Sequence, residues 1–147
     1  MLQRFTGALG ERIALTDVSF KPWCAARQTM AATQALREII ESGIAPAAMD
    51  EIKISVLPPH LKMIDHGVKS GDRASHLTSV QYCMAVAALA SKMVPDVGQS
   101  PVDLSPPLRD FMDKIKVEAD ENLLSDYPAP GRRACGCPPV RHSMSDW

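Results

Sequence analysis

The sequence predicts an α+β domain in which helices pack on one face of a small β-sheet. Two observations carry this prediction: some segments repeat apolar residues at helical spacing, and others alternate apolar with charged residues. The chain has 147 residues, of which 46% are hydrophobic, so it can bury one core of ordinary size. We assign the domain to residues 1–126. Residues 127–147 are rich in Pro, Gly, Arg and Cys without an apolar period, which predicts an extended or disordered tail.

Three elements are expected between Thr16 and Leu57. Apolar residues predict a strand over Thr16–Phe20, which Pro22 ends because proline cannot donate to a β-ladder. Helical spacing predicts a helix from Ala25 to Ser42, with Gly43 placed as its C-terminal cap. Strict alternation of isoleucine and valine with polar residues predicts a half-buried strand over Asp50–Leu57.

Four further elements are expected: a helical turn over His60–Ile64, a helix capped by Asp72 or Ser75, a short helix over Pro107–Lys114 and a strand over Ile115–Ala119. The second of these is nearly apolar over Met84–Ala90, which predicts burial on several sides.

The charge balance excludes some classes of partner. The net charge is −1, from 16 basic and 17 acidic residues, and no run of Lys or Arg forms a track for phosphates. We therefore expect no nucleic-acid partner. No apolar run reaches the roughly 20 residues that span a bilayer, and the first residues lack the pattern of a signal peptide. We expect no membrane association and a cytoplasmic location.

The four cysteines are Cys24, Cys83, Cys135 and Cys137, and we expect free thiols, because a cytoplasmic chain with a large core does not need disulfides. Cys135-Gly136-Cys137 has only His142 nearby, whereas a structural zinc site needs four ligands. We expect no metal site.

Two cations near the start of the first helix are candidates for anion binding. Lys21 precedes this helix and Arg27 falls in its first turns. The partial positive charge and free N–H groups of a helix N-terminus would add to both. Taken alone, however, the residues favour the simpler interpretation that both are solvated surface charges.

Four segments carry recognisable motifs. The first has a Lys, a Pro-containing aromatic step, an Arg and a Thr before an Ala-rich helix: Lys21, Pro22, Trp23, Cys24, Arg27, Thr29, Ala31 and Ala32. The second is Gly43–Pro46 followed by Ile52–Val56. The third is the helix over Arg73–Ala87, and the fourth runs from Val117 to Pro128. In this order, the four segments resemble the MmgE/PrpD family over about Leu2 to Pro128.

This resemblance implies a fold and an activity. Family members include 2-methylcitrate dehydratase, aconitate decarboxylase and an iminodisuccinate epimerase, which work without a metal or organic cofactor. They have a larger helical domain and a smaller α+β domain, with the active site between the two. The chain looks like the smaller domain. Lys21 and Tyr82 fall on active-site positions, where Lys21 would hold a substrate carboxylate or assist proton transfer and Tyr82 would donate a hydrogen bond or a proton.

Four further residues are candidates for substrate binding: Arg27, Trp23, Arg73 and His66. Each has a simpler alternative. Trp23 either lines the possible anion site around Lys21 or is a packing residue. Arg73 either binds substrate or forms a helix cap or an ion pair. His66 follows Asp65, but neighbouring residues rarely face each other. For Tyr82 itself, the sequence alone favours a packed ring with a satisfied hydroxyl.

The chain departs from the family pattern at two positions. Ala26 and Met30 stand where some members carry histidines. We therefore expect an isolated or truncated substrate-binding domain of a lyase or isomerase for small polycarboxylates that is inactive alone, and whether it catalyses any reaction stays open. The alternative is a non-catalytic interaction module that forms a homodimer or higher oligomer through apolar surface on the Leu77–Leu89 helix. A structural remnant without a ligand is a third alternative.

Overall fold

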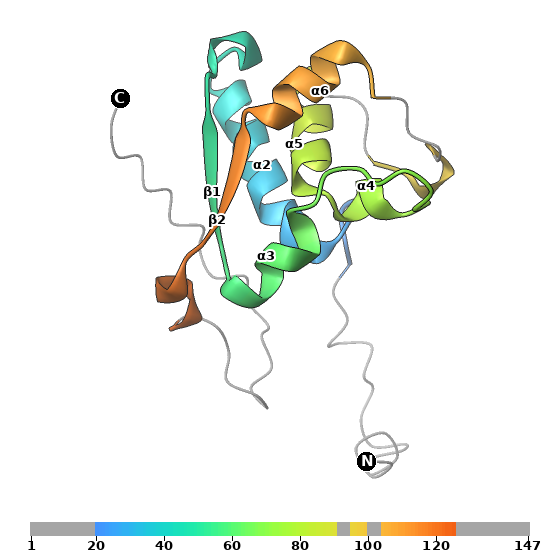
Figure 1. Cartoon of the computed structure of the whole chain (residues 1–147). Helices are drawn as coiled ribbons and strands as arrows, with labels where there is room; N and C mark the ends of the chain where they lie inside the picture. The colour runs from blue at the N-terminus through green and yellow to red at the C-terminus, as the bar shows by residue number, and fades with distance from the viewer. Residues whose placement is uncertain (1–19, 91–94, 100–103, 126–147) are drawn as a thin grey trace, which may run out of the picture.

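The computed structural model describes residues 20–90, 95–99 and 104–125, which form a small α+β domain (Figure 1). Its helices and strands are α2 (Arg27–Glu41), β1 (Ile52–Val56), α3 (Pro58–Ile64), α4 (Ser75–Thr78), α5 (Val80–Leu89), α6 (Pro106–Asp113) and β2 (Ile115–Ala119). Short 3₁₀ turns cover Pro46–Ala48, Val97–Gln99 and Glu121–Leu124. The predicted fold class is therefore confirmed. The strand expected over Thr16–Phe20, except Phe20 itself, and the tail over 127–147 lie outside the described residues.

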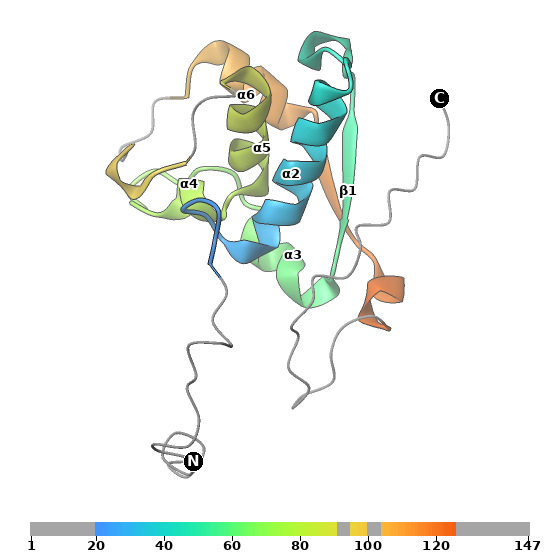
Figure 2. The same cartoon turned by 180° about the vertical axis from the view of Figure 1, so that it is seen from behind.

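Strands β1 and β2 pair in parallel, with Ile52 opposite Ile115 and Ile54 opposite Val117. The chain between them makes a long crossover through α3, α4, α5 and α6. Ile54 and Ile115 are buried, whereas Lys53 alternates to the exposed face. Figures 1 and 2, seen from opposite sides, both place α2 and α5 on one side of this sheet.

Helix α5 lies at the centre of the domain. Its residues 80 and 82–87 are all buried, and α2 and α6 pack against it. The predicted burial of this helix is confirmed. The expectation of exposed apolar surface along Leu77–Leu89 is wrong, since Leu89, 45% exposed, is its one strongly exposed large apolar side chain. Packing inside the domain itself already covers the helix, so the expected homo-oligomer loses this basis and stays a prediction.

The predicted helix beginning at Asp72 or Ser75 is in fact two helices. Ser79 separates α4 from α5 with an extended backbone at φ −78° and ψ 116°. Its hydroxyl oxygen accepts a hydrogen bond from the Tyr82 backbone N–H at 3.2 Å and so caps α5. Ser75 instead bonds the backbone of Lys69, and Asp72 accepts from the Ala74 N–H. The break arises because a serine hydroxyl offers the backbone an alternative to continuous helix.

Replacing Ser79 with alanine removes this cap, and we expect the free energy of unfolding to fall by about 1 kcal/mol. Urea unfolding followed by circular dichroism measures the change. The matched control is Ser42→Ala, because Ser42 is exposed and lies at the C-terminal end of α2 instead of at a helix N-terminus. Equal stability losses in the two variants would contradict the capping role.

Candidate functional site

The structure brings together two segments that sequence analysis singled out separately. The Ala26 N–H, at the start of α2, donates to the Leu77 carbonyl of α4 at 2.8 Å. One turn further along α2, the Thr29 hydroxyl donates to the Ala26 carbonyl at 2.8 Å and lies beside the Cys83 thiol of α5. The segment containing Lys21 therefore lies against the α4–α5 junction that carries Tyr82 (Figure 2).

Lys21 is exposed and folds back over the start of α2, where its Nζ donates to the Ala25 carbonyl at 3.0 Å. An ammonium group has three N–H donors, so two remain for a ligand. Ala26, the N-cap of α2, makes no side-chain capping bond, and the first turn holds no acidic residue. Arg27 is the first residue of the helix and is exposed. The two cations and the helix N-terminus thus occupy one corner.

Trp23 is half-buried beside α2. The guanidinium carbon of Arg37 lies 5.1 Å from its ring centroid, a cation–π contact. The indole Nε1 is buried and has no hydrogen-bond partner among the described residues. This contact fastens the segment before α2 to the helix, which favours the packing role that sequence analysis left open for Trp23.

Tyr82 is 3% exposed, and its ring stands at 86° to that of His76, with 5.6 Å between centroids. Burial, followed by the neighbouring Cys83 thiol, raises the pKa of the Tyr82 phenol. The phenol therefore keeps its proton at neutral pH. No hydrogen bond joins its oxygen to another described residue, so the O–H group has donor capacity for a ligand.

His66 lies in the loop after α3, with both ring nitrogens engaged. Nδ1 is 2.8 Å from the Gly67 carbonyl oxygen and Nε2 is 3.1 Å from the Thr78 hydroxyl. Since a carbonyl only accepts, Nδ1 carries the hydrogen. Asp65 instead accepts from the Gln81 amide, so Asp65 and His66 turn to different partners. His66 joins this loop to α4.

Arg73, the last of the predicted binding residues, is exposed in the loop just before α4. It therefore precedes the α4–α5 segment that carries Tyr82.

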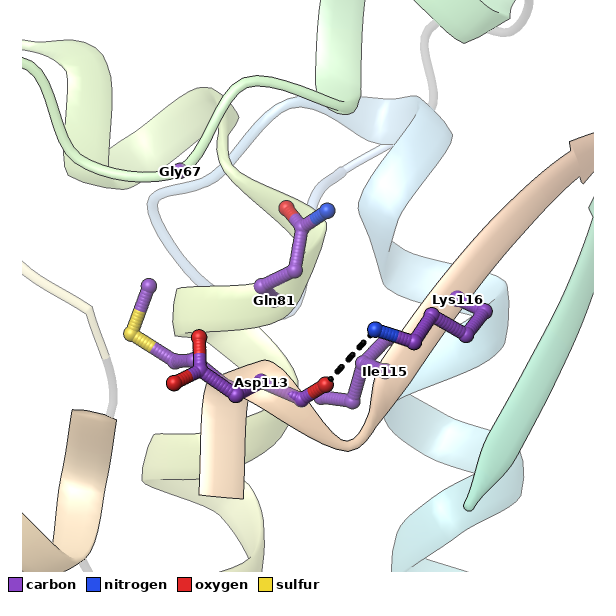
Figure 3. A pocket seen from close by; sticks show the side chains of 6 residues that line it. Gly67, Gln81, Asp113, Ile115 and Lys116 are labelled. Atoms are coloured by element: carbon purple, nitrogen blue, oxygen red, sulfur yellow. Dashed lines mark hydrogen bonds between the residues drawn. The ribbon is translucent and has the colours of Figure 1, made fainter. Parts of the chain in front are cut away.

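A shallow hollow of about 310 Å³ opens beside the first turn of α5 (Figure 3). It is lined by Gly67, Gln81, Met112, Asp113, Ile115 and Lys116. The Lys116 ammonium donates to the Asp113 carbonyl at 3.0 Å. None of the predicted site residues lines it. Sequence analysis missed this hollow because its charged residues look like ordinary exposed positions at the end of a helix and the start of a strand.

Other features bear on metal binding and location. Cys24 is exposed and Cys83 is buried, and both are free thiols. Within residues 20–90, 95–99 and 104–125, no group of three His, Cys, Asp or Glu side chains could hold a metal ion. Cys135-Gly136-Cys137 lies outside these ranges. The described helices include none with the length and apolarity to cross a membrane.

Comparison of the sequence with models of protein families identifies the family of this chain. The model of the MmgE/PrpD C-terminal domain matches residues 23–146. The chain belongs to the MmgE/PrpD family. The matched range includes Trp23, Arg27, His66, Arg73 and Tyr82, whereas Lys21 lies two residues before it. A search of curated proteins finds no match.

The two described cysteines of this MmgE/PrpD domain should differ sharply in reactivity. Burial raises the pKa of the Cys83 thiol to about 11, although a hydrogen bond with Thr29 opposes the shift. At pH 8 only about one Cys83 thiol in a thousand is ionised, and the thiolate is the reactive form. We expect iodoacetamide to label exposed Cys24 in the native protein and to leave Cys83 unlabelled, as read by peptide mass spectrometry.

Unfolding in urea is the control for this experiment, since Cys83 should then be labelled as fast as Cys24. Rapid labelling of Cys83 in the native protein would contradict its burial.

Proposed function

We propose that this domain is the carboxylate-holding part of a cofactor-independent MmgE/PrpD-type lyase or isomerase site for small polycarboxylates. The observation that supports this most directly is the hydrogen bond from the Ala26 N–H to the Leu77 carbonyl. It brings the cationic start of α2 against the segment that carries Tyr82. An anion at this corner would therefore meet positive charge on one side and a phenol-bearing helix on the other.

The proposed roles follow from the chemistry of the groups. Lys21 supplies a point charge with two N–H donors left over, and Arg27 supplies a planar fork that matches a carboxylate. Tyr82 donates a hydrogen bond or a proton. Removal of a proton next to a carboxylate builds up negative charge, which cationic groups and donors of this kind stabilise.

We propose weaker contributions from the other three candidates. Trp23 forms an apolar wall that its contact with Arg37 holds in place. Arg73 offers a second exposed cation beside α4. His66 acts mainly by fixing the loop after α3 through Thr78, and it contacts substrate only at the edge of the site.

The proposed domain holds a substrate but does not turn it over. Ala26 and Met30, the positions where some relatives carry histidines, have no ionisable group. His66 and His76 are each bonded to neighbouring groups, at Thr78 and at the Asp96 carbonyl. We therefore place the general base of the proposed reaction on a polypeptide segment other than the described residues around Lys21.

The binding role predicts the effect of removing one cation. Calorimetric titration with cis-aconitate should show binding at low ionic strength, and Lys21→Ala or Arg27→Ala should weaken it about 10- to 100-fold, the loss typical of a charge-assisted hydrogen bond. The matched control is Lys53→Ala, which removes a lysine from the exposed face of the sheet. Equal weakening by all three substitutions would indicate nonspecific charge attraction and reject the site.

The absence of turnover is a separate prediction. The protein, incubated alone with cis-aconitate or 2-methylcitrate, should give no dehydration, hydration or decarboxylation product by NMR. The missing general base is the reason. Turnover that disappears in Lys21→Ala would overturn this part of the proposal while supporting the binding role.

A further inference from the structure

His76 is a buried titratable residue to which the proposed chemistry gives no part. It is 1% exposed, on α4, and its Nε2 lies 2.8 Å from the carbonyl oxygen of Asp96, twenty residues further along the chain. A carbonyl only accepts, so Nε2 carries a hydrogen in both the neutral and the charged imidazole. This bond fixes the orientation of the His76 imidazole.

The fixed imidazole stands directly against the Tyr82 ring. The two planes meet at 86° with centroids 5.6 Å apart, the edge-to-face arrangement that aromatic pairs prefer. A bond from a side chain to the backbone also joins the two helices, since the Cys83 thiol donates to the His76 carbonyl at 3.6 Å. The Ser79 hydroxyl holds the Tyr82 N–H from the other side of the junction.

Among the described residues, ring packing is what orients the Tyr82 hydroxyl. A buried tyrosine is usually oriented in part by a hydrogen bond of its own O–H group. No such bond reaches another described residue. The neighbouring rings and side chains are what remain, and His76 is the neighbour whose own orientation is fixed by a hydrogen bond.

We infer that His76 is a positioning residue, which fixes the Tyr82 ring and keeps water from its face through the bond to the Asp96 carbonyl. This goes beyond the proposed function, because it concerns Tyr82 in the free protein. It rests on the proposed function only for the role of the Tyr82 phenol as a donor to substrate. The segment 95–99 then has a structural role, since its Asp96 carbonyl accepts the hydrogen bond that holds the His76 imidazole in place.

The sequence offers a direct optical readout. The chain has two tyrosines, Tyr82 and Tyr127, so Tyr127→Phe leaves Tyr82 as the only phenol. Phenolate absorbance against pH then reports Tyr82 alone, without any ligand. In this background the phenol should titrate above pH 10, because burial and then the Cys83 thiol raise its pKa.

The decisive variant is His76→Phe in the Tyr127→Phe background. It keeps an aromatic ring but cannot donate to the Asp96 carbonyl, so the ring is no longer held. We expect the Tyr82 titration to move down toward the value of about 10 of an exposed tyrosine. His60→Phe, the same change at a half-buried histidine on α3, should leave the titration in place. A folded His76→Phe protein that titrates as its parent does would overturn the inference.

Two further measurements can also contradict the inference. His76→Gln retains a donor for Asp96 and lacks the ring, so a folded variant with the parent's titration would also overturn the inference. In the parent itself, NMR should show nuclear Overhauser effects between the His76 and Tyr82 ring protons, and their absence would reject the contact. Because no ligand is present, a failure here leaves the polycarboxylate site untouched, and loss of cis-aconitate binding in Lys21→Ala says nothing about His76.

Discussion

Helix α5 is apolar on every side, and its burial determines where the other described elements lie. A helix of this kind cannot face water on any stripe, so it needs cover all round. Helix α2 covers one side and α6 another, while Ile54 and Ile115 reach the same core from the sheet. These two helices keep most of their charged residues exposed, although α2 also buries the polar side chains of Thr29 and Thr33. Helix α5 contributes little to the surface apart from Gln81 and Leu89.

The same burial explains the hydrogen bonds at the start of α5. A buried helix end must satisfy its first N–H groups without water, and Ser79 does this for Tyr82. Serine at that point breaks the helix from α4, and the break leaves the Leu77 carbonyl open to the Ala26 N–H. One capping residue therefore connects the packing of the core to the corner where Lys21 and Arg27 lie.

Regular periodicity made most of the fold predictable. The alternation in Ile52–Val56 and the helical spacing in α2 predict both elements to within two residues of the observed bounds. The buried face of α2 was predicted less well, because it includes Thr29 and Thr33 as well as Leu36, whereas Ile39 is exposed. The break at Ser79 was not predictable in this way, because apolar spacing continues across it. The roles of the predicted site residues stay a prediction. The bonds from Ala26 to Leu77, from His66 to Thr78 and from His76 to Asp96 join segments whose pairing no local pattern reveals.

The substitution of alanine at position 26 defines what this end of the domain can do. Ala26 is the N-cap of α2, and its backbone N–H is already committed to Leu77. A histidine there would place an imidazole beside Lys21, whose charge would favour the neutral, basic form of the ring. With alanine, the described residues at the start of α2 include the two cations Lys21 and Arg27 but no imidazole. Under the proposed function, these cations and the Tyr82 phenol would stabilise a carboxylate or a developing negative charge, and the step that creates that charge would take its base from another segment.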